Sequence, residues 1–149
     1  MDSGEVVTIT PGTVERDGVL EIPRWIHDAI VAHALEDTPN EACGLLAGRE
    51  GRIEHLFRMR NADQSPKTYR LEPTEQLRAF REIEDRGWDL TGIYHSHTHT
   101  EAYPSATDRR QAFYPEAVYV LISLSKMTPV VRAFRIRDEV VEECETRVV

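Results

Sequence analysis

Residues 88–108, WDLTGIYHSHTHTEAYPSATD, decide the fold of this chain and indicate its chemistry. The first seven form an apolar run typical of a strand, and that strand leads directly into His95, Ser96 and His97. Because side chains at positions i and i+2 share one face of a strand, His95 and His97 should converge on one point. Two converging histidines indicate a metal site, and His99 could extend the row.

The residues after the histidines offer a third ligand. Pro104 and Ser105 close a loop, and Asp108 begins what the pattern predicts to be a short helix reaching Phe113. Ser105 and Asp108 also fit the Ser-x-x-acid signature of a helix start, in which the serine caps the backbone. Capping alone does not explain the histidines, and a helix N-terminus favours the ionised carboxylate that binds metal. Asp108 is therefore the best candidate for the third ligand.

Zinc held by two histidines and one carboxylate keeps a position open for water, lowers the pKa of that water towards roughly 7 and polarises a carbonyl. Hydrolysis then needs a proton carrier. Glu41 is a candidate because it is the single charge at the start of the apolar run 41–48, where partial burial would raise its pKa. Glu101 competes, but the pattern places it at an exposed loop tip. The Ser105 hydroxyl could also donate to an oxyanion.

Composition favours one folded domain. The chain has 149 residues, of which 40% are hydrophobic, which is enough for a core that needs no disulfide or structural metal. A net charge of -8 with no basic stripe disfavours nucleic acid and anionic membrane surfaces as partners. Cys43 and Cys144 form neither a metal knuckle nor a disulfide framework. With no signal-peptide pattern and no apolar run of about 18 residues, we expect a reduced, cytoplasmic location.

Periodicity divides the chain into strands and helices. Residues 1–18 are predicted to be an N-terminal arm or edge strand, and residues 19–149 the domain. One helix should begin at Pro23, with His27 and His33 at its surface or boundary, and a second at Pro73. Strands are predicted at 19–22, 41–48, 52–59, 88–97, 117–123, 130–136 and 140–144. Helices alternating with strands early and consecutive strands late predict an α/β fold with a mixed sheet flanked by helices.

At this point the residues resemble the JAMM or MPN+ metallopeptidases. The motif of that family is a Glu on an early strand, followed much later by His-x-His, ten residues and Asp, which Glu41, His95, His97 and Asp108 match. Ser105, preceded by Pro104, also agrees, and the resemblance covers roughly residues 19–136. Thr98 departs from the pattern, because many members carry Pro there.

The resemblance implies a role for each matched residue. His95, His97 and Asp108 would bind one zinc ion per chain, Glu41 would be the general acid-base, and Ser105 would stabilise the oxyanion. It also implies an α/β fold like that of cytidine deaminases.

Family substrates are typically isopeptide or peptide-like bonds after the Gly-Gly tail of ubiquitin or ubiquitin-like proteins. This chain looks like the short bacterial type that releases cysteine from a sulfur-carrier protein, which places it in cysteine biosynthesis. The leaving amine could equally be another amino acid or a lysine side chain. The β-rich C-terminal segment could pair with a second copy at an exposed edge, giving a homodimer.

Two alternatives remain open. A non-catalytic MPN scaffold would only bind partners, but scaffold members usually lack a ligand, and this chain lacks none. A different zinc hydrolase could use His95, His97 and His99 as a three-histidine set on a small molecule. Nucleobase deamination is disfavoured because the Pro-Cys-x-x-Cys half of that motif is absent.

Overall fold

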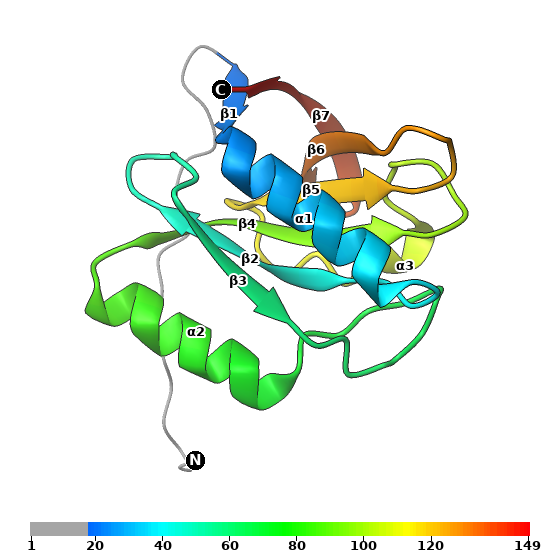
Figure 1. Ribbon diagram of the computed structural model, residues 1–149. Coiled ribbons are helices and arrows are strands. Elements are labelled where there is room, and N and C mark those ends of the chain that lie inside the picture. Colours follow the sequence, from blue (N-terminus) through cyan, green and yellow to red (C-terminus); the bar gives the residue numbers. More distant parts are fainter. Residues whose placement is uncertain (1–17) are drawn as a thin grey trace.

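The computed structural model describes residues 18–149, which form one mixed seven-stranded sheet with helices around it (Figure 1). In chain order the elements are β1 (Val19–Ile22), α1 (Arg24–Asp37), β2 (Cys43–Gly48), β3 (His55–Met59), α2 (Pro73–Asp85), β4 (Asp89–His97), α3 (Ala106–Arg110), β5 (Val118–Ser123), β6 (Val130–Arg137) and β7 (Val140–Val148). The strand order is β1-β7-β6-β5-β4-β2-β3. The predicted mixed sheet with flanking helices is confirmed. The β-like run within the expected arm lies outside the described residues.

The sheet is mixed because two of its pairs are parallel. β4 pairs with β5 in parallel, as β1 does with β7, and the other neighbours are antiparallel. Each face has its own core. On one face Ile26 and Ile30 of α1 pack with Leu46 and Val120, and on the other Ile83 of α2 packs with residues such as Leu45. β4 lies between β2 and β5 and contributes side chains to both cores, which fixes the strand that carries the two histidines.

The C-terminal strand differs from the prediction. It was expected to end at Cys144, but β7 continues to Val148, and its last residues pair in parallel with β1. In the strand order of the described sheet, the outer strands are β1 and β3. Pairing between two distant segments leaves no periodic signal within either one, which explains the difference.

Two smaller differences concern the helices. α3 covers Ala106–Arg110 instead of beginning at Asp108, because Ser105 already caps it. His33 is buried, with 4% of its surface exposed, where a surface or boundary position was expected. Its ring nitrogens contact the Tyr94 hydroxyl and the Asp37 carboxylate, so the buried polar ring has hydrogen-bond partners. Among the described helices, none combines the length and the apolarity that a membrane crossing requires.

Candidate metal centre

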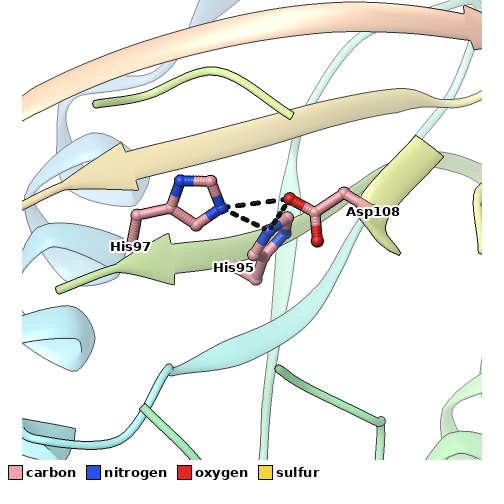
Figure 2. Close-up of side chains that lie close together, drawn as sticks. All are labelled: His95, His97 and Asp108. Atoms are coloured by element: carbon pink, nitrogen blue, oxygen red, sulfur yellow. Dashed lines mark hydrogen bonds and ion pairs between the residues drawn. The ribbon is translucent and has the colours of Figure 1, made fainter. Parts of the chain in front are cut away.

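Two short segments hold the three side chains singled out as ligands. His95 and His97 project from the end of β4, and Asp108 projects from α3 (Figure 2). Ser105 caps this helix, since its hydroxyl oxygen accepts a hydrogen bond from the Asp108 amide at 3.0 Å. In return the Ser105 amide donates to Asp108 Oδ2 at 2.9 Å. The capping box predicted from the sequence is confirmed, and it fixes the carboxylate that faces the histidines.

The three facing atoms form a nearly regular triangle. His95 Nε2 lies 3.2 Å from His97 Nε2, and the two nitrogens lie 3.1 and 3.0 Å from Asp108 Oδ2. Ligand atoms held about 2.0–2.1 Å from a tetrahedral zinc would be about 3.3 Å from one another. The two nitrogens and one oxygen therefore fit a small divalent cation and are compatible with zinc.

The hydrogen-bond partners of His97 determine which of its nitrogens can bind metal. Its Nδ1 lies 2.8 Å from the Glu101 carbonyl oxygen, which can only accept, so Nδ1 carries the hydrogen. In the neutral ring the lone pair is then on Nε2 and faces the Asp108 carboxylate. A cation between the two groups would satisfy both, and the carbonyl supplies the outer contact that ligating histidines usually have.

The pKa values reflect the crowding of these groups in the absence of metal. Burial acts to raise the pKa of Asp108, but its hydrogen bonds to His95 and His97 outweigh burial and lower that pKa. Burial alone would lower the pKa of His97, yet its hydrogen bonds to Asp108 and to the Glu101 carbonyl raise it. Burial dominates at His95 and lowers its pKa. The site therefore holds an ionised carboxylate beside two histidines of unequal basicity.

Glu41 lies beside this group. The Ser96 amide donates to the Ala42 carbonyl at 3.0 Å, so the pairing between β2 and β4 continues past Cys43 and brings Glu41 level with His97. The Glu41 side chain is 3% exposed, and its Oε1 is buried without a hydrogen-bond partner among the described residues. Burial raises its pKa to about 8, against the opposing effect of His97. A carboxyl group with this pKa can both accept and return a proton near neutral pH.

A cavity of ≈ 220 Å³, which no sequence pattern predicted, lies next to Tyr69. Tyr69 links this cavity to the metal ligands, because its ring lines the cavity and stacks on the ring of His95 at a centroid distance of 4.2 Å. Phe113, Tyr114 and Tyr119 supply the other aromatic walls. Phe113 is 73% exposed.

The competing candidates from the sequence lie outside this group. His99 is exposed and is not among the described residues whose ligand atoms converge. Glu101 is exposed as well, and its contact with His97 is made by its main-chain carbonyl.

Comparison with known proteins gives consistent results. Residues 23–137 match the family described as prokaryotic homologs of the JAB domain. The CysO-cysteine peptidase of Mycobacterium tuberculosis is 48% identical over 134 residues, which cover 88% of this chain and 92% of that protein. The desampylase of Haloferax volcanii is 38% identical over 103 residues, covering 64% of this chain and 74% of that protein. The solution structure of a protein from Desulfitobacterium hafniense superimposes with a TM-score of 0.78 at 38% identity, covering 88% of this chain and 92% of that chain.

Proposed function

This chain belongs to the prokaryotic homologs of the JAB domain and is a hydrolase of that family, and we propose that it cleaves, with zinc, the amide bond after the C-terminal Gly-Gly of a ubiquitin-like or sulfur-carrier protein. The observation that carries the proposal is the triangle of His95 Nε2, His97 Nε2 and Asp108 Oδ2, with the buried Glu41 carboxyl beside it. These groups are what metal-assisted amide hydrolysis requires.

In the proposed mechanism His95, His97 and Asp108 would hold the zinc, which when bound would lower the pKa of a water and polarise the scissile carbonyl. Glu41 takes the proton of the attacking water and delivers it to the leaving amine, a transfer suited to a carboxyl with a pKa of about 8. The Ser105 hydroxyl oxygen accepts from the Asp108 amide, so its own hydrogen is free to donate to the carbonyl oxygen as negative charge develops there.

The substrate is proposed from the relatives. The high identity to the CysO-cysteine peptidase, over most of both chains, favours a carrier protein that bears cysteine on its C-terminal glycine. Cysteine would then be the leaving amine, and its release would be a step in cysteine biosynthesis. The desampylase likeness keeps a protein conjugate as the second possibility.

The test uses purified protein loaded with one zinc and a sulfur-carrier protein extended beyond Gly-Gly by cysteine. Mass spectrometry should show loss of the cysteine, and the chelator-treated protein should be inactive. Glu41→Gln should retain zinc and lose turnover by about 10²-fold or more, because the variant keeps the shape of the side chain and removes its proton transfer. Glu101→Gln, which alters the competing acid and keeps its carbonyl, should retain turnover.

The alternatives predict other results. An active Glu41→Gln variant would refute the assigned acid-base. Zinc-loaded protein that binds the carrier and leaves its bond intact would favour the scaffold function. Cleavage of carriers joined to a lysine side chain, but not of those ending in cysteine, would transfer the proposal to protein conjugates.

A further inference from the structure

The two histidines of the metal centre are oriented by different means. His97 Nδ1 donates to the Glu101 carbonyl, whereas His95 Nδ1 is buried and has no hydrogen-bond partner among the described residues. Ligating histidines usually bond their second nitrogen to a carboxylate, a carbonyl or water, which fixes the plane of the ring. The neighbours of His95 on the adjacent strands are Cys43 and Leu121, and neither offers a strong acceptor.

Tyr69 supplies the contact that His95 lacks. The two rings are stacked with centroids 4.2 Å apart and planes inclined by 20°. Stacking of two rings favours one ring plane and adds to the free energy of burial. With Tyr69 on its flat face, the His95 ring cannot rotate about its Cβ–Cγ bond without losing that contact or colliding with the tyrosine.

The backbone around Tyr69 is fixed by one side chain. Asn61 donates to the Thr68 carbonyl at 2.9 Å and accepts from the Arg70 amide at 3.1 Å, so the residues on both sides of Tyr69 are held. The side-chain amide of Asn61 also donates to the Glu41 carbonyl at 3.1 Å. The stacking ring is therefore tied to the segment that carries the proposed acid-base, and its position does not depend on an exposed loop alone.

We propose that Tyr69 is a positioning residue for the metal centre: its stacked ring aims His95 Nε2 at the metal, in the place of the hydrogen bond that aims His97. The proposal rests on the proposed function only in taking His95 as a zinc ligand. Stacking needs a flat ring and not a hydroxyl group, so phenylalanine should replace tyrosine and an aliphatic residue should not.

The experiment measures the zinc dissociation constant by competition with a chelator, and the stability of the same metal-free samples by urea unfolding. Tyr69→Phe should bind zinc within about threefold of the unaltered protein, whereas Tyr69→Leu should bind 10- to 100-fold more weakly, the range found when outer contacts of a metal ligand are lost. Tyr114→Leu is the matched control, because Tyr114 lines the same cavity and packs on Phe80 but contacts no ligand. It should change stability without changing zinc affinity.

Three results would overturn the proposal: unchanged zinc affinity in Tyr69→Leu, equal weakening in Tyr114→Leu, or weakening in Tyr69→Phe as large as in Tyr69→Leu. If Tyr69→Leu does not fold, Tyr69→Met and the absorption spectrum of bound cobalt take its place, with an altered spectrum expected in Met and an unaltered one in Phe. Failure of the unaltered protein to bind zinc would instead contradict the proposed function.

Discussion

Tyr94 and His95 are neighbours on β4, so their side chains point to opposite faces of the sheet, and the two faces use histidine differently. On the face opposite the metal ligands, His33 Nδ1 lies 2.7 Å from the Tyr94 hydroxyl, and His33 Nε2 lies 3.1 Å from Asp37 Oδ2. The carboxylate can only accept, so Nε2 carries the hydrogen and Nδ1 accepts from the tyrosine. A neutral His33 satisfies both bonds and has a structural role.

This arrangement predicts a pH dependence of stability. Burial lowers the pKa of His33, and Arg58 adds to that effect, while Asp37 and Glu36 oppose it. Between the ordinary pKa of 6.5 and the lower pKa of His33 in the folded protein, the unfolded chain binds a proton that the folded chain does not. The stability that the neutral His33 ring contributes is therefore complete above pH 6.5 and is lost as the pH falls from there through the pKa of the folded protein. The slope from one proton cannot exceed about 1.4 kcal/mol per pH unit.

The measurement compares urea unfolding of the metal-free protein and of His33→Gln between about pH 7.5 and about pH 5. At the higher pH the variant should be less stable than the unaltered protein, because the Tyr94 hydroxyl loses its partner. Its stability should fall less as the pH is lowered. The difference between the two slopes isolates His33 from the other groups that titrate in this range. Parallel slopes would contradict the role given to His33.

At the scale of elements, the pairing of β2 with β4 depends on a residue without a side chain. Gly44 lies opposite Tyr94, and a Cβ atom there would collide with the Phe57 carbonyl oxygen and with the ring and hydroxyl of Tyr94. Gly44→Ala should therefore lower the free energy of unfolding by about 2–3 kcal/mol, the upper part of the range for overpacking, because one of the colliding atoms is main chain.

Gly87→Ala is the control for this substitution. Gly87 follows α2 with a φ of +69°, and a Cβ atom added there would have nothing within 4 Å. Backbone strain alone should therefore lower the free energy of unfolding by about 1 kcal/mol. Urea unfolding of both variants gives the comparison. Equal losses at the two positions would show that the close approach of Tyr94 to β2 is not what requires glycine.

The sequence predicts best those elements whose signal is local. The strand 19–22 and the starts of α1 and α2 near Pro23 and Pro73 agree with the structure to within a residue. The alternation of His95 and His97 likewise brings their side chains to one point. The extension of β7 to Val148 was missed, because it depends on β1 from the other end of the fold.

The site divides in the same way. The position of Glu41 beside His97 was expected from the family resemblance, since one charge before an apolar run is a weak signal by itself. The stacking of Tyr69 on His95 and the bond from His33 to Tyr94 were not predicted. Each contact joins segments far apart in the sequence, and a periodic pattern within one segment cannot reveal such a contact.

At the scale of the whole molecule, the proposed ligands come together only in the folded state. His95 and His97 end a central strand, Asp108 begins a separate helix, and Tyr69 reaches the same point from the segment before α2. A cation bound there would join these segments, and the unfolded chain would offer it no comparable site. Zinc binding and folding should therefore be linked, even though the two cores are built of apolar residues that need no metal.

This linkage predicts a thermal shift that also separates the two candidate ligand sets. At a free zinc concentration about 100 times the dissociation constant, binding should add about 2.7 kcal/mol and raise the Tm by roughly 5–10 °C, and a chelator should reverse the shift. His99→Ala should keep the shift, because His99 is exposed and outside the triangle, whereas Asp108→Ala should abolish it. If His99→Ala lost the shift and Asp108→Ala kept it, the metal would be held by three histidines. Asp108 would then be only a helix residue whose carboxylate closes the capping box with Ser105, so the same pair of variants decides whether the start of α3 binds metal or merely ends a loop.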